Sequence, residues 1–220
     1  MSATLRIDVF FDFICPWCLI GKRHLERALD LLRIRRPDVQ QELAWHGVQL
    51  LPHLPPQGVP FAEFYRQRLG SAEAVRMRQA QVQQAAADAG LSLDLSGIDV
   101  MPNTATAHRL LQHASALGGA ARRNALLEKL FDAYFHDGKN LADPAVLLAM
   151  AQECGYPQDA LADCLSADAT PLDDNGMPAR GVPYFIFNRR IEVSGAQPPQ
   201  LLLQAMEQAL EQDTNRSSSL

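Results

Sequence analysis

The chain lacks long apolar runs, and no stretch approaches the roughly 18 consecutive apolar residues that a membrane-spanning helix needs. We therefore expect no membrane span. A secretory signal peptide has a basic segment, then a long apolar core and a cleavage site of small residues. Residues 1–6 and the segment that follows them do not show this pattern. These two absences predict a cytosolic protein.

Basic residues are also scarce, with 20 Lys and Arg against 25 Asp and Glu and a net charge of −5. Nucleic-acid binding needs clustered Lys and Arg. The nearest cluster, Arg33, Arg35 and Arg36, equally suits the C-terminal end of a helix, where cations complement the helix dipole. We therefore expect neither nucleic acid nor a membrane as a partner. The 47% of hydrophobic residues, by contrast, suffices for a sizeable core.

Cysteine is rare too, with four residues in 220. In a reducing compartment, a closely spaced pair is more often catalytic or metal-binding than a structural disulfide. Cys15 and Cys18 form such a pair in the segment Cys-Pro-Trp-Cys. A zinc site commonly needs a second close cysteine pair or paired histidines. Cys154 and Cys164 do not have that spacing, so we expect no metal, and two inert buried thiols are the remaining alternative.

The position of Cys15 in the chain indicates redox chemistry. The apolar segment Leu5–Phe13 predicts a buried strand, and Pro16–Leu32 predicts a helix with Pro16 in its first turn. Unpaired N–H groups and the dipole at a helix start favour the thiolate, which is the nucleophile in disulfide exchange. Cys18 lies one turn later on the same helix face. The pattern predicts that Cys15 attacks and that Cys18 resolves the mixed disulfide.

The remaining segments predict an α/β fold with an insertion. A second strand at 39–50 is followed by a proline-rich loop and a long segment rich in Ala, Leu, Gln and Arg. The predicted helices are 61–69, 72–89, 104–117, 120–135, 144–153, 158–165 and 199–212, and a hairpin is predicted at 184–187 and 191–194. We expect a discontinuous domain, residues 1–57 and 171–220, and an inserted helical domain, residues 58–170. Asp173–Gly176 predicts a turn.

The segment FDFICPWCLIGKRHLERAL, residues 11–29, resembles the active-site segment of the DsbA-like thioredoxin superfamily, and more narrowly its FrnE-type branch. Further matches follow in order: NT and AHRL within 103–110, LFDAYF at 130–135, GVP at 181–183 and VSGAQP at 193–198. The resemblance implies a thioredoxin fold with a large all-helical insertion between the second and third strands. It also implies a thiol–disulfide oxidoreductase that acts on protein or low-molecular-weight thiols. No cofactor is implied beyond a redox-active Cys15–Cys18 disulfide, with glutathione or another thiol as a candidate co-substrate.

The resemblance also implies particular site residues. The Val182–Pro183 bond is expected to be cis and to lie beside the cysteines, so that Pro16, Trp17, Val182 and Pro183 contact substrate. Trp17 alternatively packs against the helical insertion. His24 and His108 are candidate modulators of the thiolate, although surface or structural roles are the alternative.

Two features depart from the pattern or stay open. Gln49 stands where relatives often carry an acidic residue, which weakens a proton-relay role there. Cys154 and Cys164 are expected to be free thiols, with a second disulfide as the alternative.

Two rival functions remain: a glutathione-dependent isomerase or transferase of the kappa or hydroxychromene-carboxylate type, and a non-enzymatic binding protein that retains the fold.

Overall fold

The computed structural model describes residues 3–166 and 181–217. The chain divides into two compact units, one of Met1–Val48 with Asn175–Leu220 and one of Gln49–Asp174. No helix within the described ranges is both long and apolar enough to cross a membrane.

The first unit is built on a four-stranded sheet with the strand order β2-β1-β5-β6. Its elements are β1 (Ala3–Phe11), α1 (Pro16–Arg35), β2 (Val39–Gly47), β5 (Tyr184–Phe187), β6 (Ile191–Ser194) and α8 (Pro199–Ser217). β1 pairs in parallel with β2 and antiparallel with β5, which in turn pairs antiparallel with β6. Because a parallel pair needs a crossover connection, α1 follows β1 and returns the chain to the start of β2.

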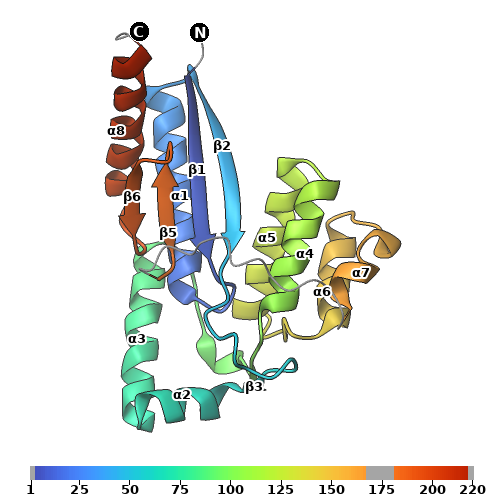
Figure 1. Cartoon of the computed structure of the whole chain (residues 1–220). Coiled ribbons are helices and arrows are strands. Elements are labelled where there is room, and N and C mark those ends of the chain that lie inside the picture. Colours follow the sequence, from blue (N-terminus) through green and yellow to red (C-terminus); the bar gives the residue numbers. More distant parts are fainter. Residues whose placement is uncertain (1–2, 167–180, 218–220) are drawn as a thin grey trace. The chain divides into compact units, whose positions relative to one another are not determined.

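Helices α1 and α8 lie side by side against one face of this sheet (Figure 1). Leu5, Ile7 and Val9 of β1 point to this face and are at most 2% exposed. They share a core with Leu29 of α1 and Met206 of α8. Burying one such side chain stabilises a fold by roughly 1.5–3 kcal/mol. The alternating residues of β1, Arg6, Asp8 and Phe10, therefore belong to the opposite face.

The second unit is mainly helical. Its elements are β3 (Val59–Pro60), α2 (Phe61–Leu69), α3 (Ala72–Asp88), β4 (Val100–Met101), α4 (Ala105–Leu117), α5 (Ala120–Phe135), α6 (Pro144–Glu153) and α7 (Ala162–Leu165), with short 3₁₀ turns at Leu95–Gly97 and Gln158–Ala160. Leu110 of α4 and Leu127 and Leu130 of α5 are fully buried in its interior. Asp143 is the N-cap residue of α6, because its carboxylate accepts a hydrogen bond from the backbone N–H of Ala145 at 2.8 Å.

The predicted fold class is confirmed, since α2 to α7 all lie between β2 and β5, the third strand of the sheet. The helices predicted at 61–69, 120–135 and 144–153 have those bounds. The predicted helix at 158–165 is instead a 3₁₀ turn followed by the four-residue α7. The predicted turn at Asp173–Gly176 and the predicted domain boundary at residue 170 lie outside the described residues.

The insertion, predicted as all-helical, also contains the antiparallel ladder of β3 and β4. Gly58, just before β3, has a φ of +84°, and a Cβ there would lie 2.6 Å from the carbonyl oxygen of Met101. The two strands approach closely because residue 58 has no side chain. Strands of two residues are too short to show the alternation by which sequence predicts them.

Candidate active site

Cys15 is the N-cap residue of α1 and has an extended backbone, with φ −88° and ψ 107°. Pro16 occupies the first turn of the helix, where its missing N–H costs no hydrogen bond. The Cys15 carbonyl accepts the backbone N–H of Cys18 at 2.9 Å, and the Cys15 N–H donates to Asp12 O at 3.1 Å. This geometry confirms the predicted strand-to-helix junction. The partial positive charge of the helix start therefore acts on the Cys15 sulfur.

The two cysteines differ in their surroundings. Cys15 is 7% exposed and Cys18 is 2% exposed, and both are thiols in this structure. Burial raises the pKa of Cys18 well above its usual value. A hydrogen bond with Cys15 and the charge of Cys15 raise the pKa of Cys18 further, while a backbone hydrogen bond at Asp12 partly offsets them. Cys18 therefore keeps its proton in the dithiol form, while Cys15 is the slightly more exposed of the two residues.

Val182 and Pro183 lie beside Cys15. The Cys15 thiol donates to the carbonyl oxygen of Val182 at 3.8 Å, and the Val182–Pro183 peptide bond is cis, as the resemblance implied. Pro183 is buried and lies so close to Gly21 of α1 that a Cβ on Gly21 would be 2.9 Å from its Cγ. The second turn of α1 therefore holds this loop against the helix that carries both cysteines.

A small apolar cluster supports Val182 from the sheet. Phe10, Val48 and Tyr184 are its buried members, and Val182 and Ile186 pack against it. Phe10 and Tyr184 meet edge to face, with ring centroids 6.4 Å apart. This cluster lies on the sheet face opposite the α1–α8 core, because its β1 and β5 members alternate with core residues.

The other predicted site residues occupy different environments. Pro16 and Trp17 are half-buried in the first turn of α1. Nδ1 of His24 lies 2.9 Å from the carbonyl oxygen of Gln197. This contact ties α1 to the segment before α8. His108 is buried in α4 of the second unit.

Gln49 takes part in a hydrogen-bond network within the second unit. Its amide donates to Oδ1 of Asn103 at 2.6 Å, and Nδ2 of Asn103 donates to Leu54 O at 2.7 Å. Asn103 Oδ1 also accepts the backbone N–H of Ala105, the first residue of α4, at 3.1 Å, while Thr104 is the N-cap residue. The residue that replaces the usual acid is therefore a structural link to the start of α4.

Cys154 and Cys164 are free, half-buried thiols. Burial raises the pKa of both, and a nearby cation partly offsets it, Lys129 for Cys154 and Arg109 for Cys164. Within residues 3–166 and 181–217, no three His, Cys, Asp or Glu side chains gather closely enough to hold a metal ion.

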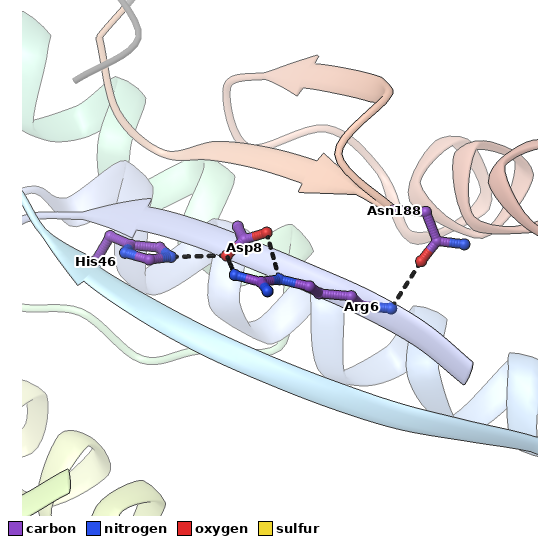
Figure 2. A network of polar contacts seen from close by, with 4 residues as sticks. All are labelled: Arg6, Asp8, His46 and Asn188. Atoms are coloured by element: carbon purple, nitrogen blue, oxygen red, sulfur yellow. Dashed lines mark hydrogen bonds and ion pairs between the residues drawn. The ribbon is translucent and has the colours of Figure 1, made fainter. Parts of the chain in front are cut away.

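A second polar constellation was missed by the sequence analysis. On the sheet face opposite α1 and α8, Asp8 bonds both Arg6 and His46, and Asn188 bonds the backbone of Arg6 (Figure 2). The alternation of Arg6, Asp8 and Phe10 with Leu5, Ile7 and Val9 was the available signal for a polar sheet face. The pairing of Asp8 with His46 follows only from the register of β1 and β2.

Comparisons with known proteins agree with this geometry. The probable DsbA oxidoreductase SCO1869 from Streptomyces coelicolor is 28% identical, with a TM-score of 0.78 over 93% of this chain and 89% of that chain. The cytosolic disulfide reductase DsbM from Pseudomonas aeruginosa, solved with GSH, shares the fold at 19% identity, with a TM-score of 0.58 over 96% of this chain and 99% of that one. The uncharacterized protein YwbO of Bacillus subtilis is 27% identical over 152 residues, which are 69% of this chain and 67% of that protein. The sequence profile of the DSBA-like thioredoxin domain matches residues 6–207. The chain therefore belongs to the DSBA-like thioredoxin domain family.

Proposed function

We propose that this protein exchanges disulfides with protein thiols or low-molecular-weight thiols through Cys15 and Cys18. The observation that carries the proposal is the asymmetry of the two sulfurs. Cys15 caps α1 within 3.8 Å of Val182 O, whereas burial and Cys15 itself keep Cys18 protonated. The family and the likeness to a probable DsbA oxidoreductase support the same class of reaction.

The exchange takes two thiol–disulfide steps. In the oxidising direction, a substrate thiolate attacks Cys15 Sγ of the Cys15–Cys18 disulfide, and Cys18 leaves and takes up a proton. A second substrate thiolate then attacks the substrate sulfur of this mixed disulfide, so that Cys15 leaves with both electrons and the substrate disulfide forms. The reducing direction runs these steps in reverse. The reduction potential relative to that of the substrate sets the direction.

Val182 is proposed to bind the substrate through its backbone. A substrate segment that lies extended beside residues 182 and 183 would pair in the manner of strand addition. Pro183 has no N–H to offer there, so Val182 carries the polar contact, while Pro16 and Trp17 border the sulfur from α1. No cofactor is proposed beyond the two cysteines. Glutathione is a candidate co-substrate, and the neighbour DsbM is described with GSH.

Trapping of mixed disulfides tests the proposal. Cys18→Ser removes the resolving sulfur, so its Cys15 thiolate should attack a disulfide substrate, release one substrate thiol and remain in a mixed disulfide, whereas Cys15→Ser should accumulate none. Cys154→Ser and Cys164→Ser are the controls, and we expect both to turn over substrate as the unmodified protein does. Trapping by Cys15→Ser instead would reverse the two roles.

The rival functions make different predictions. A glutathione-dependent isomerase uses a single catalytic sulfur or hydroxyl, so an isomerase reaction would survive Cys18→Ser. A binding protein with an inert Cys15 would show slow alkylation of Cys15 at neutral pH. We expect fast alkylation of Cys15 and loss of turnover in both single variants. Cytosolic placement also stays a prediction, which the in-cell thiol redox state of the protein would test.

A further inference from the structure

A pocket of about 360 Å³ lies on the sheet face opposite α1 and α8. Its lining comes from all four strands and the β5–β6 turn: Asp8, Phe10, His46, Ile186, Arg189 and Glu192. We call it the sheet-face pocket. Its volume is within the roughly 300–1,000 Å³ range of small-molecule sites. The exchange reaction proposed above gives none of these side chains a chemical step, although Phe10 and Ile186 belong to the cluster that packs against Val182.

One wall of the sheet-face pocket has balanced charges. Asp8 accepts two hydrogen bonds from the Arg6 guanidinium, at 3.1 Å from Nε and 3.0 Å from Nη2. Nε2 of His46 lies 2.8 Å from the Asp8 carboxylate, as Figure 2 shows. Asp8 is only 7% exposed, and Arg6 neutralises its charge. The Asp8 carboxylate therefore fixes the position of the His46 ring. Because Arg6 neutralises Asp8, this carboxylate does not attract a charged ligand.

The opposite wall carries two charges that are not balanced. Glu192 accepts a hydrogen bond from the Tyr184 hydroxyl but forms no ion pair with the described residues. Arg189 is exposed and has no ion-pair partner among the residues that the structure describes, whereas its neighbour Arg190 pairs with Asp213. Arg189 and Glu192 therefore line the pocket without a counter-ion among the residues that the structure describes.

The floor between these walls is apolar. Phe10 and Ile186 belong to the same apolar cluster, and the His46 ring stacks on Phe10 with centroids 4.7 Å apart and planes 21° apart. A ligand that spans from Arg189 to Glu192 would therefore lay an apolar group on this floor.

The backbone at Arg189 also distinguishes the pocket. Arg189 has φ +59° and Asn188 has φ +48°, both in the left-handed region. Asn commonly adopts this conformation, but a long side chain such as Arg rarely does. The turn is held by Asn188, which bonds the Arg6 backbone at 2.8 Å and Asp213 at 2.7 Å. Positive φ at both central residues is the geometry of a type I′ hairpin turn, closed here by the Arg190 N–H bond to Phe187 O at 3.0 Å, and this turn places Arg189 in the pocket lining.

We propose that the sheet-face pocket binds an apolar α-amino acid in its zwitterionic form. Arg189 pairs with the ligand carboxylate, Glu192 pairs with the ammonium group, and the side chain lies on Phe10 and Ile186. The pocket is a second site, independent of the disulfide exchange at Cys15.

Calorimetric titration of the full-length protein with leucine and phenylalanine tests the proposal. N-acetylleucine lacks the ammonium group and leucine amide lacks the carboxylate, so each should bind at least about tenfold more weakly than leucine. Equal binding of N-acetylleucine and leucine would overturn the assignment of Glu192. No binding of leucine or phenylalanine at millimolar concentration would overturn the proposal.

Matched variants locate the site. Arg189→Gln and Glu192→Gln should each weaken leucine binding by about tenfold or more. Arg33→Gln, which removes an exposed arginine of α1 outside the pocket, should leave binding unchanged. Arg189→Gly should fold as stably as the wild-type protein, because glycine readily adopts the left-handed conformation of this turn. It should nevertheless fail to bind leucine. Wild-type binding by Arg189→Gly would overturn the assignment of Arg189.

The disulfide exchange provides the separate readout. Leucine and phenylalanine have no sulfur, so their binding does not depend on Cys15 or Cys18. Arg189→Gln should exchange disulfides at the wild-type rate while it fails to bind leucine. Loss of exchange in Arg189→Gln would overturn the independence of the two sites.

Discussion

A Cβ on Gly21 would lie 2.9 Å from Cγ of Pro183 and 3.3 Å from the ring of Phe185. The helix that begins at Cys15 therefore meets the proline loop through a residue that has no side chain. Because Val182 O lies 3.8 Å from Cys15 Sγ, the fit at Gly21 also sets the surroundings of the reactive sulfur.

Gly21→Ala should disturb this fit. The added methyl group has to displace the Pro183 ring, and such overpacking costs about 1–3 kcal/mol of unfolding free energy. We expect a lower unfolding midpoint in denaturant and a changed reduction potential, because Val182 moves with Pro183. Gly97→Ala is the control, since a Cβ at Gly97 meets no atom within 4 Å. If Gly21→Ala has the unfolding midpoint and reduction potential of the wild-type protein, the Pro183 loop accommodates the added methyl group at no cost.

The raised pKa of Cys18 predicts that the stability of the reduced protein depends on pH. Cys18 holds its proton more tightly in the folded state than in the unfolded state, where the pKa is about 8.5. Its contribution is therefore fully present below about pH 8.5 and is lost as pH rises toward the folded pKa. Thermal melts of reduced and oxidised protein should diverge above pH 8.5, with the reduced form losing stability. Cys154 and Cys164 are thiols in both forms, so their effects cancel. Cys18→Ala forms no Cys15–Cys18 disulfide, so only its thiol form is melted, and the same loss of stability above about pH 8.5 in this variant would assign the effect to another group.

His24→Ala should cost stability without changing the chemistry. The variant loses the hydrogen bond to the Gln197 carbonyl, which is worth about 0.5–1.5 kcal/mol. We expect a lower melting temperature and a wild-type rate of disulfide exchange. A slower rate at unchanged stability would instead make His24 a modulator of the Cys15 thiolate.

Asp8→Asn should be costly at neutral pH. Burial alone would raise the pKa of Asp8, but the hydrogen bonds from Arg6 and His46 outweigh burial and lower it. Losing charged hydrogen bonds costs about 1.5–3 kcal/mol. The contribution of Asp8 is complete above the unfolded pKa of about 3.9 and is lost as pH falls through its lower folded pKa.

Unfolding free energies of wild-type protein and Asp8→Asn should therefore differ at pH 7, begin to approach each other only below about pH 4, and converge as pH falls through the lowered folded pKa of Asp8. Asp38→Asn removes an exposed carboxylate that pairs with Arg36, and we expect little effect from it. A constant difference between wild-type protein and Asp8→Asn across this range would show that packing, rather than charge, explains the loss.

Local signals predicted most of the elements. Helices α2, α5 and α6 begin and end at the predicted residues. The Asp143 cap before Pro144 and left-handed Gly70 after α2 are typical of helix ends. The hairpin of β5 and β6 was also predicted with its observed bounds. Strand ends were less accurate, since β2 was predicted to continue to Leu50 but ends at Gly47.

The sequence by itself determined the order of helices and strands, the position of Cys15 at a strand-to-helix junction, and the family. These depend on backbone propensities, on the period of apolar residues and on contiguous motifs, all of which act over a few neighbouring residues. Only the tertiary structure decided the contact of Gly21 with Pro183, the pairing of Asp8 with His46, and the burial that keeps Cys18 protonated. Each of these joins or encloses residues far apart in the chain, and their distances follow from strand register and helix packing.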